Sequence, residues 1–150
     1  MKKTLLIWIF ICSGVYMSGQ NLKPSSIPGN VKATFTDIYP NSQPSVWSKY
    51  NGNFSAQFEL NNKNMYMVIN PAGEWVETRA QITRNDLPAA TLTYLTANYG
   101  AENLKEMYKV THAGGGVITY QVETGDQLLQ FSTDGTFLKT EKASTALFSK

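Results

Sequence analysis

The same order of landmarks occurs twice along this chain of 150 residues. Each copy has a helix-like stretch opened by proline, a tyrosine at the end of that stretch, and a glycine turn before a late aromatic residue. These landmarks are Ile27-Pro28, Tyr39-Pro40 and Gly73 before Trp75 in the first copy, and Leu87-Pro88, Tyr99-Gly100 and Gly135 before Phe137 in the second. Self-similarity at a fixed period indicates a repeated structural unit. We therefore predict a tandem duplication with copies at 28–82 and 83–142, in which Phe35 and Leu95 are equivalent and both buried between helix and sheet.

The hydrophobic pattern gives each copy one helix and four strands. Apolar residues recur at helical spacing in 31–39 and 92–99, and Pro40 and Gly100 end these helices. Asn51-Gly52 favours a two-residue hairpin turn. The strands predicted from alternation and turn residues are 46–50, 54–60, 65–69, 75–82, 104–111, 117–124, 127–132 and 137–141. This α-β-β-β-β order, repeated, predicts an α+β fold with two helices on one face of a continuous antiparallel sheet.

The first residues are typical of an export signal. Lys2 and Lys3 precede an apolar run that is too short to cross a bilayer, and small residues follow at Ser18 and Gly19. We predict a signal peptide at 1–19, cleavage near Gly19, and a periplasmic or secreted mature protein without stable membrane insertion. Residues 20–27 are predicted to be a flexible leader, 28–142 a single domain, and 143–150 a tail. The lone cysteine, Cys12, lies in the signal, where lipid attachment is the less favoured alternative.

Charge and composition argue against nucleic-acid binding. Removal of Lys2 and Lys3 leaves 11 basic residues against 11 acidic ones, a net charge of zero. Proteins that bind nucleic acids normally present a basic face that neutralises phosphates. A mature chain without cysteine also has no disulfide, so its stability has to come from a packed core.

The residues required for catalysis do not form a recognisable set. His112 is the only histidine and lies beside the glycines 114–116, where we expect a polar loop residue. Metal sites need several converging ligands, so we predict no metal and no cofactor. The carboxylate pairs Glu74/Glu77 and Glu102/Glu106 have the surroundings of solvated surface charges. We therefore predict that the protein is not an enzyme.

Strand alternation suggests a binding face. Phe54, Ala56, Phe58 and Leu60 form one apolar set, which should face the helices. Alternation likewise assigns Val46, Ser48, Tyr50, Val76, Thr78 and Ala80 to the helix side, and Glu77 and Arg79 to the opposite face. By the same alternation we assign a second set of side chains to the opposite face: Trp47, Gln57, Tyr66, Trp75, Tyr108, Gln121 and Phe137, with Leu128, Thr119 and Gln130 nearby. Aromatic anchors with a polar rim are typical of interface cores. The alternative is that the strand parity is misassigned and these rings belong to the core.

The order of motifs resembles the secreted bacterial PepSY-like family. The matching residues are Phe35, Tyr39-Pro40, Val46-Trp47, Phe58, 73–78, 87–90, Tyr99, 120–122, Phe131 and Gly135. The resemblance implies a duplicated module with the fold of the β-lactamase-inhibitor protein. It also implies a non-enzymatic exported protein whose concave sheet face binds a protein. Asn70 and Ser132 replace the acidic residue usual at the late turn, which weakens any expectation of a cation there.

Two binding functions follow as hypotheses. The first is recognition of a protein or peptide, such as a peptidase or another envelope enzyme that the module inhibits. The second is a carrier of a small ligand or glycan that uses aromatic rings as stacking platforms. A shallow aromatic sheet face favours the first, whereas a closed pocket favours the second.

Overall fold

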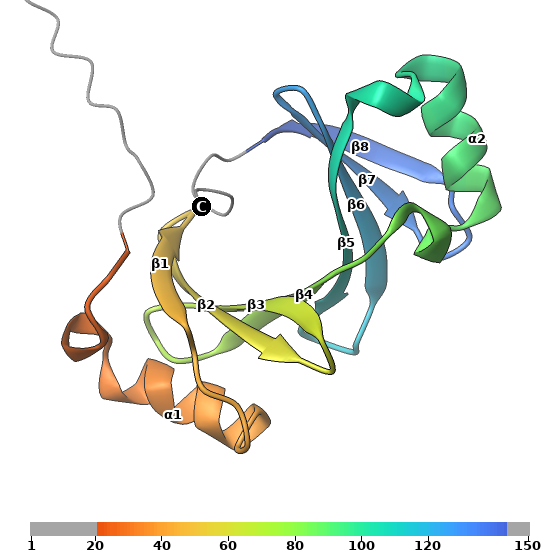
Figure 1. Ribbon diagram of the computed structural model, residues 1–150. Coiled ribbons are helices and arrows are strands. Elements are labelled where there is room, and N and C mark those ends of the chain that lie inside the picture. Colours follow the sequence, from red (N-terminus) through yellow and green to blue (C-terminus); the bar gives the residue numbers. More distant parts are fainter. Residues whose placement is uncertain (1–20, 144–150) are drawn as a thin grey trace, which may run out of the picture.

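The computed structural model describes residues 21–143, which form one eight-stranded sheet and two α-helices (Figure 1). The predicted signal peptide and residues 144–150 of the predicted tail lie outside the described residues. The elements are η1 (Pro24–Ser26), α1 (Gly29–Ile38), β1 (Val46–Tyr50), β2 (Asn53–Leu60), β3 (Lys63–Ile69), β4 (Trp75–Gln81), η2 (Arg84–Asp86), α2 (Ala89–Asn98), η3 (Ala101–Asn103), β5 (Leu104–His112), β6 (Ile118–Thr124), β7 (Gln127–Ser132) and β8 (Phe137–Lys142).

The sheet is a continuous antiparallel meander in the order β1 to β8, so each strand pairs with its neighbours in sequence. The sheet is strongly curved, and both helices lie on its outer side, α1 against the first strands and α2 against the last (Figure 1). The α+β class and the placement of two helices on one face are thus confirmed. We call the side of the sheet that faces away from the helices the concave face.

Both helices begin and end as the sequence indicates. Pro28 and Pro88 precede the first helical residues, where a missing N–H costs little. Before α2, Thr83 and Asp86 form a capping box, and hydrogen bonds from Thr83 lower the pKa of the Asp86 carboxyl. Gly100 ends the second helical segment with a φ of 73°, which glycine adopts at little cost.

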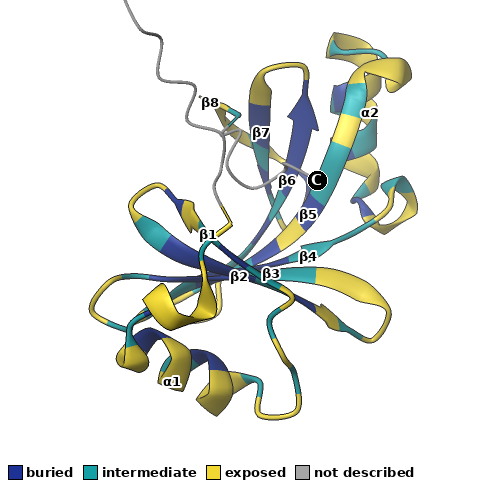
Figure 2. Cartoon of the chain, turned by 60° about the vertical axis from the view of Figure 1, so that its left-hand side comes forward, coloured by how far each residue is buried: buried dark blue, intermediate teal, exposed yellow. Residues whose placement is uncertain are grey.

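Each helix packs its buried face on its own group of strands. In α1, Val31 and Phe35 contact a cluster that includes Phe58 and Met67. The exposed residues of α1 lie on its outer side (Figure 2). In α2, Leu95 contacts a second cluster that includes Leu129 and Phe131. Phe35 is 2% exposed and Leu95 is fully buried, as the alignment of the two copies predicts.

A glycine turn contacts the start of each helix. Gly73 and Gly135 both have positive φ angles, 87° and 89°. The Thr34 hydroxyl, one turn inside α1, donates a hydrogen bond of 2.5 Å to the carbonyl of Gly73, and the Thr91 hydroxyl, in the first turn of α2, donates one of 3.5 Å to the carbonyl of Gly135. A Cβ atom at Gly135 would lie 2.9 Å from the Thr91 nitrogen, so a larger residue does not fit.

The predicted flexible leader, 20–27, is wrong from residue 21 onward. The Leu22 N–H donates a 2.6 Å hydrogen bond to the Trp47 carbonyl, which attaches this segment to the edge strand β1. Ile27 is 3% exposed and belongs to the α1 cluster. The apolar side chains of the segment extend the core beyond the predicted repeat.

Candidate functional site

The concave face is polar, although many of its side chains are buried. The strand registers align Gln57, Tyr66, Arg79, Val110 and Thr119 in one row across five strands. A neighbouring row joins Gln81, Tyr108, Gln121, Gln130 and Lys139. Gln57, Tyr66, Tyr108 and Gln121 therefore lie on this face, as predicted.

Trp47 does not lie there, and its predicted placement is wrong. The two-residue turn at Asn51-Gly52 pairs Tyr50 with Asn53, which sets Trp47 opposite Ala56. Residues directly opposite each other share a face, so Trp47 faces the helices. It is 5% exposed and packs edge-on against Phe35, with ring centroids 6.0 Å apart. Tyr50, predicted to face the helices, lies instead on the concave face beside Val68.

The predicted placement of Trp75 and Phe137 on the concave face is also wrong, and the reason is the same for both residues. A β-bulge between Val68 and Ile69 sets Trp75 opposite Ile69, and a bulge between Gln130 and Phe131 sets Phe137 opposite Phe131. Each bulge shifts the alternation by one residue and returns the ring to the helix side. Trp75 packs on the α1 cluster and Phe137 on the α2 cluster, where it stacks on Tyr94. Val76, predicted to face the helices, lies on the concave face.

A buried ion pair lies on the floor of the concave face. Arg79 and Glu77 are 3% and 8% exposed, and the Arg79 Nη2 to Glu77 Oε1 distance is 2.6 Å. Arg79 Nη2 also donates a 2.7 Å hydrogen bond to the hydroxyl of Tyr50, and the guanidinium lies 4.6 Å from that ring. Arg79 Nη1 has no partner among the described residues. Glu77, predicted to be solvated, is therefore a structural part of the floor.

His112 is not the loop residue that the sequence suggested. It ends β5, with its Nε2 2.9 Å from the Thr119 hydroxyl and its Nδ1 3.3 Å from Glu77 Oε2. A hydroxyl, an imidazole and a carboxylate in this order resemble a nucleophile, a base and an orienting group. Thr119 is 7% exposed, however, and already accepts a hydrogen bond from Gln130 Nε2. The arrangement holds His112 firmly and leaves the hydroxyl poorly accessible to a substrate.

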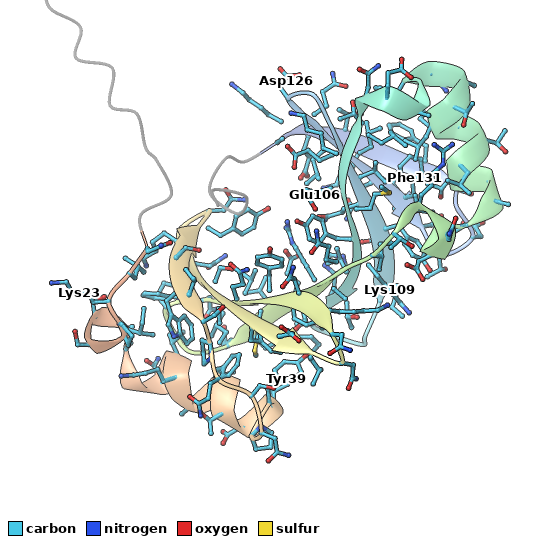
Figure 3. All side chains as sticks on the ribbon, viewed as in Figure 1. Lys23, Tyr39, Glu106, Lys109, Asp126 and Phe131 are labelled. Atoms are coloured by element: carbon cyan, nitrogen blue, oxygen red, sulfur yellow. The ribbon has the colours of Figure 1, made fainter. Side chains whose placement is uncertain are left out.

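A second cluster lies on the same face and contains two carboxylates and two tyrosines. Glu106 projects from the inner side of β5 (Figure 3) and accepts a 2.5 Å hydrogen bond from Gln81 Nε2. Glu123 is 9% exposed, and burial raises the pKa of its carboxyl, with Glu106 adding to the rise. Tyr66 and Tyr108 meet edge to face at 5.8 Å. Burial raises the pKa of both phenols, and Glu106 contributes to each shift.

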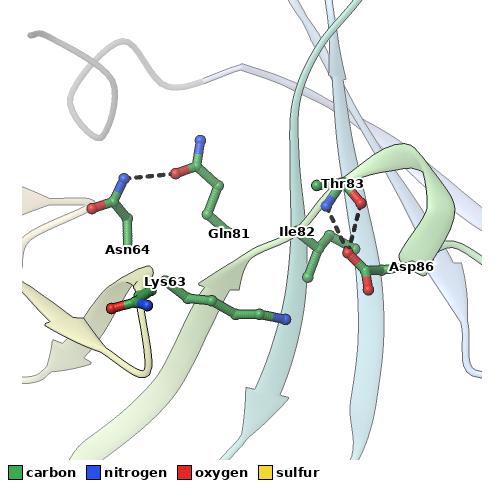
Figure 4. A pocket seen from close by; sticks show the side chains of 7 residues that line it. Lys63, Asn64, Gln81, Ile82, Thr83 and Asp86 are labelled. Atoms are coloured by element: carbon green, nitrogen blue, oxygen red, sulfur yellow. Dashed lines mark hydrogen bonds between the residues drawn. The ribbon is translucent and has the colours of Figure 1, made fainter.

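Two hollows adjoin the concave face. One, of about 260 Å³, is lined by Tyr50 and Asn53 of the first hairpin, by Glu77, Arg79 and His112, and by Lys139 and Glu141 of β8, so that both ends of the sheet border it. The other, of about 330 Å³, lies between the β2–β3 turn and the η2 segment (Figure 4). It is lined by Lys63, Asn64, Gln81 and Asp86, with Asn62, Ile82 and Thr83, and has no aromatic ring in its wall.

The described residues contain no group of three or more His, Cys, Asp or Glu side chains arranged to hold a metal ion. Within the same part of the chain, no helix is long and apolar enough to cross a membrane. The residues that sequence analysis missed are Tyr50, Glu77, Arg79, His112 and Glu123. The alternation of β4 did assign Glu77 and Arg79 to the concave face, and that was the available signal.

Comparison with solved structures identifies the fold. A Bacteroides eggerthii protein provisionally assigned to the periplasm aligns over 80% of this chain and 91% of its own length, with a TM-score of 0.62 and 20% identity. A DUF2874 family protein from Bacteroides ovatus aligns over 77% and 86%, with a TM-score of 0.60 and 24% identity. A BLIP-like protein from Bacteroides fragilis aligns over 81% and 87%, with a TM-score of 0.58 and 18% identity.

This chain has the BLIP-like fold. At such low identity the likeness establishes the architecture alone. No protein-family model matches the sequence, and no curated protein matches it significantly.

Proposed function

We propose that the protein is an exported, non-enzymatic module that binds a protein or peptide on its concave face. The observation that carries this proposal is the set of buried polar atoms there without partners among the described residues: Arg79 Nη1, Gln121 Oε1 and Glu123 Oε2. An unpaired buried polar group costs free energy. Three such atoms on one face are explained if a bound partner supplies the missing hydrogen bonds.

The residue types on this face support a macromolecular partner. Tyr66, which is partly exposed on this face, is of a kind that dominates binding energy at protein interfaces, and Tyr50, Tyr108 and Arg79 are buried in the same face. The hollow between β1 and β8, of about 260 Å³, is large enough to accept a side chain that projects from a partner. Binding by a BLIP-like protein would use the same face, as the family resemblance implies.

The proposal also includes export of the protein and an internal duplication of its sequence. The basic and apolar start of the chain supports removal of residues 1–19 near Gly19, and the provisional periplasmic assignment of a structural relative agrees with that compartment. The helix-and-four-strand order and the equivalent register shifts directly after Trp75 and Phe137 support an internal duplication of the PepSY-like type. We propose no nucleic-acid partner and no cofactor.

The alternative function, a carrier of a small ligand, would use a polar hollow in place of aromatic rings. Trp47 and Trp75 pack against the helix-side core, so they offer no stacking platform on the concave face. The hollow in Figure 4 still favours a small polar ligand, because amide, hydroxyl and charged groups line it. This second candidate would bind through hydrogen bonds of Asn64, Gln81 and Lys63, and Asn64→Ala would weaken it.

Capture of partners by face-specific variants tests the main proposal. The mature protein is used as bait in envelope extract and culture fluid of the producing cell. Gln57→Arg and Gln130→Arg place a bulky charge on the concave face, and Thr96→Arg places the same charge on the exposed side of α2. We expect partners to be lost with the first two variants and kept with the third. Equal capture by all variants would show that the concave face is not the binding surface.

A test of catalysis uses His112. Because Thr119 is buried and Arg79 shares the Glu77 carboxylate, we expect no hydrolysis of activated esters by the wild-type protein above the His112→Ala background. An ester turnover that disappears on this substitution, and that Thr119→Val also removes, would instead establish an enzyme.

A further inference from the structure

We propose that the Glu106–Glu123 end of the concave face binds a basic side chain, lysine or arginine, of the partner. This inference rests on the proposed function and specifies the chemistry that the partner has to present. The acceptor site consists of the carboxylates of Glu106 and Glu123 with the rings of Tyr66 and Tyr108 beside them.

Glu123 is the residue that most requires an explanation. Its side chain lies on β6, opposite Leu128 of β7, and the residue is 9% exposed. Its Oε2 accepts no hydrogen bond from the described residues. A carboxylate removed from water without a full set of donors destabilises the folded state. An incoming cation with N–H donors would provide both the charge and the hydrogen bonds.

Glu106 adds a second negative charge to the same region. It receives one neutral donor, Gln81 Nε2, which does not balance its charge. The β5–β6 register places Glu106 beside Glu123, because Leu104 pairs with Thr124 and Met107 pairs with Val122. The charge of Glu106 raises the pKa of Glu123, Tyr66 and Tyr108. Two neighbouring carboxylates favour a cation between them.

No cation among the described residues forms a salt bridge with Glu106 or Glu123. The charge of Lys105 acts on Glu123 and partly opposes the rise of its pKa, but the Lys105 Nζ donates its 2.9 Å hydrogen bond to the Gly125 carbonyl and forms no salt bridge with that carboxylate. Lys139 pairs with Glu141, and Arg79 pairs with Glu77. Among the described residues, these salt bridges leave Glu106 and Glu123 without an ion-pair partner of their own.

The tyrosines favour an organic cation over a metal ion. Tyr66 is partly exposed and packs edge to face on the buried ring of Tyr108, and lysine or arginine gains additional attraction from an accessible ring such as that of Tyr66. Calcium takes six or more oxygen ligands, whereas the described residues provide no cluster of three metal-binding side chains. A guanidinium or ammonium group suits a site with two carboxylates and an accessible ring.

An NMR titration tests the assignment with defined probes. The full mature chain, labelled with ¹⁵N, is titrated with Nα-acetyl-arginine methylamide, with the neutral Nα-acetyl-glutamine methylamide, and with calcium chloride. We expect saturable shifts of the Glu106, Tyr108, Gln121 and Glu123 amides with the arginine probe alone. Glu123→Gln and Glu106→Gln should each weaken binding at least tenfold, and Asp37→Asn, which removes a charge on exposed α1, should not.

The assignment is overturned if the glutamine probe shifts the same amides equally, if calcium saturates them in preference, or if Asp37→Asn weakens binding as much as Glu123→Gln. The capture experiment separates this result from the proposed function. Partners that are lost with Gln57→Arg but unaffected by Glu123→Gln and Glu106→Gln would refute the basic side chain and support the binding face. Circular dichroism of both glutamine variants would verify that each remains folded.

Discussion

Strands β4 and β8 occupy equivalent places in the two halves of the sheet, and each carries an ion pair between residues two apart. In β4, Glu77 pairs with Arg79, and their side chains are only 10% and 4% exposed. In β8 the order is reversed, Lys139 with Glu141, and the side chains are 55% and 52% exposed. The central strand buries its pair under neighbours on both sides, while the edge strand leaves its pair in water. An exposed pair contributes little, and a buried one is costly to break.

On the helix side the two halves differ much less. Phe35 and Leu95 are both buried, Ile69 and Phe131 both follow a bulge, and Gly73 and Gly135 both contact a helix start. On the helix side, equivalent positions of the two halves make similar packing contacts. On the concave side, the charged residues differ between the halves. The two halves therefore differ more on the concave face than on the helix side.

The largest effect is expected from the aromatic core of the first half. Phe35→Ala removes a ring that contacts Trp47, Phe58 and Tyr39 and should lower the free energy of unfolding by about 3–5 kcal/mol. Leu95→Ala should cost about 2–5 kcal/mol in the second half. Urea denaturation measures both, with exposed Asp37→Ala as control. An unchanged midpoint for either core variant would show that the halves do not share a helix register.

Glu77→Gln should destabilise the protein by on the order of 3 kcal/mol, because it leaves the buried Arg79 guanidinium without its counter-charge. The matched change in β8, Glu141→Gln, should cost less than about 0.5 kcal/mol, since its pair is exposed. Denaturation midpoints of the two variants give the comparison directly. Equal losses would contradict the distinction between the buried pair and the edge pair.

Substitution of alanine for the two turn glycines, Gly73 and Gly135, should destabilise the two halves of the sheet to different extents. Gly135→Ala and Gly73→Ala both strain a positive φ, which costs about 1–3 kcal/mol. The added Cβ at Gly135 meets backbone of the α2 start at 2.9 Å, whereas at Gly73 it meets the Asn30 side chain at 3.0 Å. Gly135→Ala should therefore be the more harmful. Gly52→Ala, with a φ of 79° and open space around it, isolates the strain alone, and a larger loss there would contradict this order.

Glu123→Gln should stabilise the protein at neutral pH by about 1 kcal/mol, because it replaces a buried, unpartnered charge with a neutral amide. This sign is opposite to that of Glu77→Gln. Thermal melts of both variants measure the difference. A destabilised Glu123→Gln protein would show that the carboxylate has a structural role in the fold.

The smallest effect concerns pH. The pKa of Glu123 is raised above its ordinary value of 4.5, so the folded state binds a proton more tightly than the unfolded state. Stability should therefore rise as pH falls from neutrality toward 4.5, and Glu123→Gln should flatten this part of the profile. Below 3.8, protonation of Asp86 and Asp134, whose pKa values are lowered by hydrogen bonds, acts in the opposite direction. Melts across this range would detect both slopes.

Local sequence signals predicted the helices and strands, but they did not predict for every side chain the face of the sheet on which it lies. Prolines, glycines and alternation located both helices and all eight strands, because these signals act within a few residues. The side of Trp75 and Phe137 depends on bulges after Val68 and Gln130, which the sequence does not mark. The Trp47 error was avoidable, because the predicted Asn51-Gly52 turn already fixed its register against Ala56.

The chemistry of the concave face was predicted only in part. Tyr66, Tyr108, Gln57 and Gln121 follow from alternation along single strands. The contacts of Glu77 do not, since His112 reaches it from a strand 35 residues later. Burial of Glu77 and Glu123 results from the curvature of the whole sheet, which no local pattern reports.

The meander order has a consequence for folding in time. Because every strand pairs with its predecessor, most sheet contacts join residues that are close in sequence, and such topologies form faster than sheets with distant pairings. A chain that emerges with its N-terminus first can form α1 and β1–β4 before β5 is present. During that interval β4 is an unprotected edge, open to pairing with another chain. Glu77 and Arg79 place charges along this temporary edge, and charged side chains discourage such mispairing.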